Sequence, residues 1–400
     1  MTTVTTQQSQ AVATPVGSGQ QGIWLEIVTS KESLETYLDA WNDLAANALE
    51  VNLFYEPAML LPALTHVSAG HDVVIVLMFR SVQGQEAPEL VALFPLERTS
   101  RHLGLPLKKM KLWEYDYCYL TTPLIRKGCG RESWIALFDW MKADPQAGAM
   151  LEQRFFPGEG PVYQELVELV RRRGLLTFEI ERATRSYFRR RTTADSYLEQ
   201  SLSPSKRRDL NRKWRRLEEL GTVDMRTLNN ADDLPKWIDD FLRIEASGWK
   251  GNEGTAIGCK PHGHAYFSDM CTRLFEEGRL NMIGLFLNDE PIAIRCSFLA
   301  APGAFFFKPA YNEEYSKYSP GVHLEVELIR QLHDHSAVNW MDSCTSPDNV
   351  LLNKMWLDRR CVLEFQVATK GFIAPFLLGA VQPALRWINR SLGRYRTIPD

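Results

Sequence analysis

The stretch Tyr-Ser-Pro-Gly-Val-His at residues 318–323 decides how the second half of the chain is interpreted. Ser-Pro is a common helix start, because proline lacks an N–H group that the first turn does not use. A helix expected at residues 321–335 would begin with free backbone N–H groups and the positive end of its dipole. Phosphate groups bind at such helix starts, and Gly321 would let a ligand approach the backbone closely.

The position of this stretch among strand candidates gives it weight, since alone it would be an ordinary helix start. The turns Asn-Asp-Glu and Ala-Pro-Gly separate three of the strands and favour hairpin pairing. A parallel strand needs a crossover helix, and the helix at Gly321 takes that place. The strands are expected at residues 280–287, 291–299, 304–309 and 338–342. The pattern predicts an antiparallel meander that leads into a strand-helix-strand unit.

The remaining hydrophobic patterns extend this alternation over both halves of the chain. In the second half, helices are expected at residues 198–220, 234–245, 266–277 and 348–357, with a last strand near 362–367. In the first half, strands are expected at 23–28, 73–79, 90–96 and 175–180, and helices at 33–47, 132–142 and 162–173. We therefore predict an α/β (α+β) fold with two similar domains, each a mixed twisted sheet flanked by helices.

Length and composition support two domains. The chain has 400 residues and 45% hydrophobic residues, with a formal net charge of −3 that gives no global attraction to nucleic acid. We expect a disordered leader at residues 1–22, domains at 23–185 and 186–370, and an apolar and basic tail at 371–400. The leader lacks the features of a signal peptide, and the 7 cysteines are scattered without a Cys-x-x-Cys pair. The expected location is the cytoplasm.

The run Tyr-Ser-Lys-Tyr-Ser-Pro-Gly at residues 315–321, followed by Leu324 and Glu325, resembles the signature of the CelD-like GNAT acetyltransferase family. That family is related to the Fem-type peptidoglycan aminoacyl transferases. Matching residues also occur at 203–208, 247–256, 278–280, 291–293, 342, 354 and 356. The resemblance covers about residues 186–370 well and the first half loosely.

The resemblance implies tandem GNAT-like acyl-CoA N-acyltransferase folds, with an acyl-CoA site in the second. Acetyl-CoA is the co-substrate most expected. The residues that would bind it are those of the helix start: Ser319, Pro320, Gly321, Val322 and His323.

Transfer of an acyl group from a thioester needs a base for the acceptor and an acid for the departing thiolate. Asp342 follows the last strand of the crossover unit and matches the aspartate of the family motif, so we expect it to be the base or to orient the acceptor. Its alternative is a structural carboxylate. Tyr311 and Tyr318 lie in the loop where the thiolate would leave, and a phenol is a suitable acid. Either could instead be a packing residue of the loop.

A second group of polar residues points to the acceptor. Glu245 and the sequence around Trp249 and Lys250 precede a glycine-rich stretch, and such loops serve binding or are mobile. Lys354, on the helix after Asp342, could fix a carboxylate or phosphate, or could belong to a solvated face.

The helix within residues 198–220 carries many basic side chains beside an apolar face, and Arg208 and Arg212 are its expected anion-binding residues. A core-packed helix with a solvated charged face is the alternative. Because glutamates follow at residues 218 and 219, we do not expect nucleic acid as a partner, and tRNA is a minority alternative.

Two histidine pairs, at residues 262 and 264 and at 333 and 335, lack a third ligand at useful spacing, so no metal is expected. The tail from residue 371 to residue 396 is apolar and then basic. Packing across the domain is its default interpretation, and peripheral membrane contact is the alternative.

Together these features predict a GNAT-type acyltransferase that transfers an acyl group from acyl-CoA to an amine or hydroxyl. The acceptor is expected to be a small molecule or a glycan precursor, for example of the cell envelope or of a polysaccharide. The alternatives are an aminoacyl-tRNA-dependent Fem-like transferase and a non-catalytic GNAT scaffold in polysaccharide synthesis.

Overall fold

The computed structural model describes residues 22–84, 86–334 and 337–391. Apart from Gly22, the expected leader at residues 1–22 lies outside these ranges. The chain divides into two compact units. The first holds residues 68–183 together with those up to Leu64 and those from Cys361 onward, and the second holds residues 65–67 and 184–360. The first unit is therefore discontinuous in sequence.

The first unit contains an antiparallel meander followed by a parallel pair of strands. Strands β2 and β3 pair antiparallel, as do β3 and β4, whereas β4 and β6 are parallel and the helix α4 lies between them in sequence. The elements are β1 (Trp24–Val28), α1 (Lys31–Glu35), α2 (Leu38–Ala46), η1 (Leu53–Tyr55), α3 (Pro57–His66), β2 (Asp72–Arg80), β3 (Glu89–Thr99), β4 (Lys109–Leu112), β5 (Leu124–Ile125), α4 (Gly130–Ala143), β6 (Met150–Pro157), α5 (Pro161–Arg173), α13 (Ile373–Phe376), η5 (Leu377–Val381) and α14 (Gln382–Ser391).

Two long strands have residues in both units: β7 (Thr177–Arg189) and β13 (Asp358–Ala368). The chain passes into the second unit along β7 and returns to the first along β13, whose residues from Val362 to Ala368 pair with β6. This pairing explains why the segment from Cys361 lies with the first unit, although residues up to 370 were expected in the second domain.

The second unit has the strand order β7-β12-β11-β10-β9-β8. Its pairs are antiparallel except β11–β12, which is parallel and is connected through α11. Its further elements are α6 (Ala194–Ser201), α7 (Pro204–Glu218), β8 (Val223–Thr227), η2 (Ala231–Asp233), α8 (Leu234–Ser247), α9 (Trp249–Asn252), η3 (Ile257–Cys259), α10 (Gly263–Glu276), β9 (Leu280–Leu287), β10 (Glu290–Ala300), β11 (Gly303–Tyr311), η4 (Glu313–Tyr318), α11 (Pro320–Asp334), β12 (Trp340–Asp342) and α12 (Val350–Met355).

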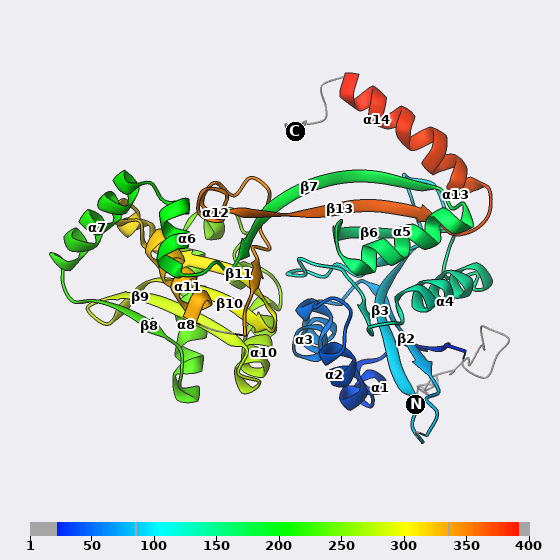
Figure 1. Ribbon diagram of the computed structural model, residues 1–400, viewed down its shortest axis with the longest axis horizontal. Helices are drawn as coiled ribbons and strands as arrows, with labels where there is room; N and C mark the ends of the chain where they lie inside the picture. The colour runs from blue at the N-terminus through cyan, green and yellow to red at the C-terminus, as the bar shows by residue number, and fades with distance from the viewer. Residues whose placement is uncertain (1–21, 85, 335–336, 392–400) are drawn as a thin grey trace, which may run out of the picture. The chain divides into compact units, whose positions relative to one another are not determined.

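Helices cover both faces of this second sheet. On one face α11 packs against β9, β10 and β11 (Figure 1), and its Leu324 and Leu328 share a buried cluster with Phe306. On the other face α8 contacts β10 and β11, and α10 contributes Phe267, which stacks on Phe307. The neighbouring residues Phe306 and Phe307 of β11 thus point to opposite faces of the sheet, as successive residues of a strand do.

The fold class expected from the sequence is confirmed: mixed sheets with flanking helices, and an antiparallel meander that precedes a strand-helix-strand unit. The expected basic helix at residues 198–220 is divided into α6 and α7, because Pro204 begins a new helix capped by Ser203. Within the described residues, no helix combines the length and the apolar character needed to cross a membrane.

Candidate functional site

Each unit contains one helix that connects two parallel strands, α4 in the first and α11 in the second. The start of α11 is open. A Cβ atom placed on Gly321 would have no described heavy atom within 4 Å, apart from chain neighbours and the helix's own backbone. Pro320 has no N–H, and the N–H groups of Val322 and His323 reach back to the Ser319 carbonyl at 3.0 and 3.3 Å. The first turn of α11 therefore offers room for a ligand at the positive end of a helix.

The start of α4 is filled by the protein's own side chains. A Cβ atom on Gly130 would lie 2.9 Å from Cγ of Glu165 and 3.4 Å from Leu49. Glu165 belongs to the neighbouring helix α5, so an acidic side chain already covers this helix start. The two crossover helices differ in accessibility, and only the start of α11 leaves space for an anion.

The basic helix α7 supplies a cation beside the start of α11. Lys213 Nζ donates a hydrogen bond to Ser319 Oγ at 2.9 Å. The next residue, Trp214, packs edge-on against His323 with ring centroids 5.2 Å apart. Burial lowers the pKa of His323 to about 4, although the Tyr318 carbonyl acts in the opposite direction. His323 is therefore neutral near pH 7. Lys213, which also pairs with Asp209 at 3.1 Å, places a positive charge at this helix start.

The strands β11 and β12 pair only over a short distance. Their register runs from Gly303 to Phe305 on β11, and β12 ends at Asp342, whereas β11 continues to Tyr311. Beyond Phe305, this edge of β11 is not covered by β12. Among the described residues, β11 beyond Phe305 therefore has no strand neighbour on the side of β12.

A β-bulge in β11 turns a lysine toward α8. Cys296 lies opposite Lys308 and Ser297 opposite Phe306, so Phe307 is an additional residue in the ladder. The bulge puts Phe307 and Lys308 on the same face of the sheet. As a result Lys308 Nζ reaches Glu245 Oε1 of α8 at 3.1 Å.

Three of the expected acceptor residues and one expected catalytic tyrosine meet around this contact. Glu245, Trp249, Lys250 and Tyr311 line one shallow hollow, together with Gly248, Ala310 and Glu313 among others. Lys250 Nζ lies 3.5 Å from Glu245 Oε1 and donates to the Pro309 carbonyl at 3.0 Å. The α8–α9 connection is thereby attached to the end of β11.

The hollow is lined by one lysine, Lys250, and by two carboxylates, the buried Glu245 and the exposed Glu313. Glu245 is buried, and its second oxygen accepts from the Ile257 N–H at 2.8 Å. Burial lowers the pKa of Lys250 and the charge of Lys308 acts in the same direction, against the attraction of Glu245. Glu245 therefore holds both lysines, and of the two only Lys250 lines the hollow, where its ammonium can donate to a polar group.

Asp342 lies in a different environment from the one expected of a catalytic base. Its Oδ1 is 2.7 Å from Arg185 Nε and accepts from the Cys344 N–H at 2.9 Å. Its Oδ2 accepts from Arg185 Nη2 at 2.8 Å and from Arg360 Nη1 at 2.9 Å. Burial would raise the pKa of Asp342, but the two arginines hold it below its ordinary value. Both oxygens are occupied by permanent donors, so the geometry favours the structural alternative.

The other expected site residues lie outside the hollow. Tyr318 is buried, and Lys317 Nζ lies 5.0 Å from the centre of its ring. Tyr318 is therefore a packing residue of the loop. Arg208 and Arg212 are exposed and line a separate hollow of about 800 Å³ along α7, where Arg212 pairs with Asp209. Lys354 is exposed on α12. None of these four side chains lines the hollow around Glu245.

Lys308 was not among the expected site residues, although the sequence contains a signal for it. Lys308 is a charged residue within the apolar strand β11, and Arg295 is its counterpart in β10. Arg295 pairs with the buried Glu325, which also accepts from Trp356 Nε1 at 2.5 Å. A charge in an apolar strand indicates a buried partner, but it does not identify that partner. Nothing in the spacing linked Asp342 to Arg185.

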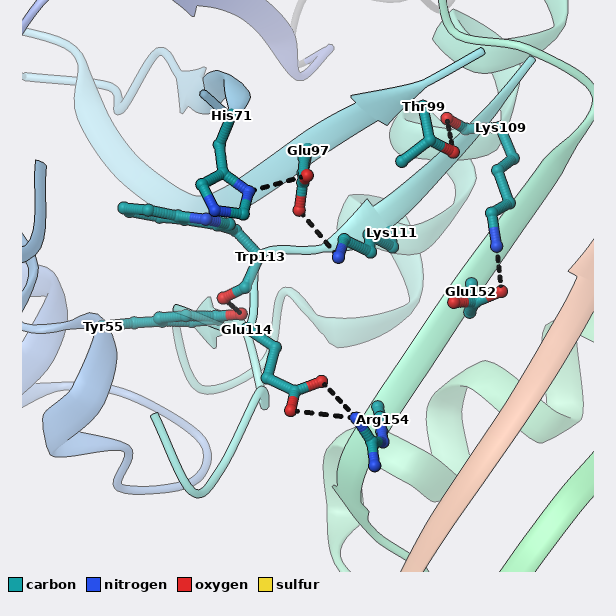
Figure 2. A network of polar contacts seen from close by, with 10 residues as sticks. All are labelled: Tyr55, His71, Glu97, Thr99, Lys109, Lys111, Trp113, Glu114, Glu152 and Arg154. Carbon is teal, nitrogen blue, oxygen red and sulfur yellow. Dashed lines mark hydrogen bonds and ion pairs between the residues drawn. The ribbon is translucent and has the colours of Figure 1, made fainter. Parts of the chain in front are cut away.

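The first unit carries a polar network of its own across β3, β4 and β6 (Figure 2). Glu97 is 2.8 Å from His71 Nδ1 and 2.8 Å from Lys111 Nζ, which lies opposite it in the strand pair. Farther along, Lys109 pairs with Glu152. Glu97 and Lys111 form a cross-strand pair of opposite charge, a common means of stabilising a sheet, and Lys109–Glu152 joins the neighbouring strands β4 and β6.

The part of the chain that the structure describes contains no evident set of metal-binding side chains. There, no group of three or more histidine, cysteine, aspartate or glutamate side chains is arranged to hold a metal ion.

Residues 204–349 match the family model described as Acetyltransferase (GNAT) domain. No curated protein matches the sequence. The crystal structure of FemX is similar with a TM-score of 0.55 and 9% identity, over 88% of this chain and 98% of that one. A conserved protein of unknown function from Bacteroides thetaiotaomicron gives a TM-score of 0.53 at 9% identity, over 83% and 97%. At these identities the similarity concerns the fold, and the second unit has the fold of a GNAT acetyltransferase domain.

Proposed function

We propose that this protein is an acyltransferase that moves an acyl group from acyl-CoA to an amine or hydroxyl. The proposal is carried by the contrast between the two crossover helices. The start of α11 is open beside Lys213, whereas the start of α4 is covered by Glu165. The open one lies within the segment that matches the GNAT domain model.

The residues at the start of α11 fit the phosphates of coenzyme A. Gly321 offers space, the first turn offers its positive end, and Lys213 adds a cation. Ser319, Pro320, Val322 and His323 would shape this cradle without supplying charge. When bound, acyl-CoA supplies the acyl group as a thioester.

The hollow at the end of β11 has a volume of about 20 Å³ and is the proposed contact point for one polar group of the acceptor. Lys250 would donate to an electronegative group of the acceptor, and Glu245 keeps Lys250 and Lys308 in place. Tyr311 lines the same hollow and is the proposed proton donor. Asp342 would act as a positioning residue that fixes the end of β12 through Arg185 and Arg360.

The acceptor class follows from the resemblance to the CelD-like family rather than from geometry. A sugar or another precursor of the cell envelope or of a polysaccharide, acylated in the cytoplasm, is the acceptor that we propose.

Calorimetric titration with acetyl-CoA tests the cofactor site. We expect binding to the intact chain and a loss of about 10-fold to 100-fold in affinity for Lys213→Met, the range of a hydrogen bond to a charged group. Gly321→Glu should abolish binding, because its carboxylate would occupy the place of a phosphate. Gly258→Glu is the matched control, since Gly258 also has open space around its Cβ position.

Folded protein that binds no acyl-CoA would contradict the proposal. If binding occurs, Tyr311→Phe separates an enzyme from a scaffold: turnover should fall while acetyl-CoA affinity stays unchanged. Unchanged cellular function with this variant would instead support a non-catalytic scaffold.

The Fem-like alternative rests on the arginines of α7. Arg208, Arg212, Arg215 and Arg216 line one hollow, an arrangement that suits a polyanion. Copurifying tRNA and binding that weakens steeply with salt would support this alternative. A coenzyme A enzyme would show neither.

A further inference from the structure

The C-terminal segment of the first unit exposes large apolar side chains. Phe372 is 93% exposed, Trp387 is 72% exposed, and Ile373 and Phe376 are each 63% exposed. Single exposed apolar residues are ordinary, but a series of them along one short segment marks a contact with another molecule or with a membrane.

The opposite side of this segment is fixed to the first unit. Ala374 and Leu378 belong to a buried cluster with Met150 and Ala368, and four residues farther on Gln382 is also buried. A spacing of four residues follows one side of a helix. The exposed residues lie off this row, so the segment has an anchored side and an outward side.

Hydrogen bonds hold the anchored side. Gln382 Nε2 is 2.7 Å from His102 Nε2 and 2.7 Å from Gln366 Oε1, and Gln366 in turn donates to Glu152 at 2.5 Å. One turn later, Arg386 Nη1 donates to the Glu179 carbonyl at 2.8 Å. Such a chain of buried polar groups gives α14 one defined orientation, so the exposure of its other side is a fixed property of the fold.

The charges of this segment have one sign. Between residues 365 and 399 the sequence contains no Asp or Glu, and its charged residues are Lys370, Arg386, Arg390, Arg394 and Arg396. The chain as a whole has a net charge of −3, so this positive charge is a local feature. Aromatic and aliphatic side chains beside arginines are the composition of helices that lie in the surface of an anionic bilayer.

We propose that α13, η5 and α14 form a surface that attaches the protein to an anionic lipid bilayer. Phe372, Ile373, Phe376 and Trp387 enter the boundary between headgroups and acyl chains, where aromatic side chains are preferred. The net positive charge of the segment attracts it to anionic headgroups. This attachment does not depend on the acyltransfer proposed above.

Cosedimentation of the full chain with vesicles tests the proposal. We expect binding to vesicles of phosphatidylcholine mixed with phosphatidylglycerol, weaker binding to phosphatidylcholine alone, and a decrease with salt. The double variant Phe372→Ser with Phe376→Ser should bind at least about 10-fold more weakly, because each buried side chain contributes roughly that factor. Circular dichroism should show an unchanged fold, since both side chains are exposed.

Ile373→Ser and Val350→Ser form a matched pair, because each replaces the first residue of a helix and each native side chain is 63% exposed. Ile373→Ser should weaken vesicle binding and Val350→Ser should not. Equal binding by native protein and the double variant, or no binding to any vesicle, would overturn the proposal. So would a dimer in light scattering that the double variant converts to monomer, because a second copy of the chain would then cover this surface.

Discussion

Replacing Asp342 with asparagine removes one negative charge from between two arginines and keeps the shape of the side chain. The side chains of Asp342, Arg185 and Arg360 are 0%, 3% and 14% exposed. Without the carboxylate, the buried guanidinium of Arg185 loses this ion pair. Removing one partner of a buried ion pair costs about 3–5 kcal/mol. We expect the unfolding free energy of the second unit to fall by that amount.

Asp240→Asn is the control for this change. Asp240 on α8 pairs with Lys236 and Arg243 at 2.6 Å each, but these two basic side chains are 68% and 58% exposed. Exposed ion pairs contribute about 0.2–1 kcal/mol. The same chemical substitution should therefore cost several times less on the surface of α8 than at the end of β12.

Urea unfolding followed by tryptophan fluorescence measures the difference. Hydrogen exchange of the α11 and β12 amides assigns the transition to the second unit, because a chain of two units need not unfold in one step. Adding Arg185→Gln to Asp342→Asn should restore part of the loss, since the buried positive charge opposite Asp342 is then removed as well. An Asp342→Asn protein that is as stable as Asp240→Asn but inactive would refute the reasoning and identify Asp342 as the base.

The pH dependence of the same variant has a defined sign. The folded pKa of Asp342 lies below its unfolded value. Its contribution is therefore complete above the unfolded pKa, about 4, and is lost as the pH falls through the folded pKa. The difference between native protein and Asp342→Asn should be constant near neutrality and shrink at acid pH.

Three further outcomes are expected. The pKa of Lys250 is lower in the folded protein than in the unfolded chain, so the unfolded state binds more protons between these two pKa values. The stability of native protein, compared with Lys250→Met, should therefore rise with pH in that range, as equilibrium unfolding at several pH values will show. His323→Gln should reduce the loss of stability between pH 6.5 and about 4, because native His323 resists protonation there. Glu325→Gln leaves buried Arg295 without its counterion and should lower stability by about 3–5 kcal/mol in the same assay.

The regular parts of the fold were predictable because their residues follow one period. Strand β9 has the bounds expected from its apolar run, and α11 begins at the Pro-Gly signal. Helix α3 was missed because Pro62 lies inside it, and β6 because charged residues interrupt its apolar pattern. Tertiary packing can form a helix or strand even where the local sequence pattern is interrupted.

The proposed site was predictable only where its parts are close in sequence. Glu245, Trp249 and Lys250 lie within one turn and loop, and the crossover topology brought Tyr311 toward them. The partner of Asp342 could not be found in this way, because Arg185 is 157 positions away in the sequence. A bulge also decided the direction of Lys308, and no residue pattern in β11 predicts which residue is the additional one.

The discontinuity of the first unit has a consequence for how the protein is made. A ribosome releases residues 184–360 as a complete stretch before it has made residues 362–368, the part of β13 that pairs with β6. The second unit thus has the character of an insertion that can fold first, while the first unit waits for the end of the chain. A fragment that stops at Ala183 would leave the edge of β6 unpaired, so the two units are unequal targets for truncation.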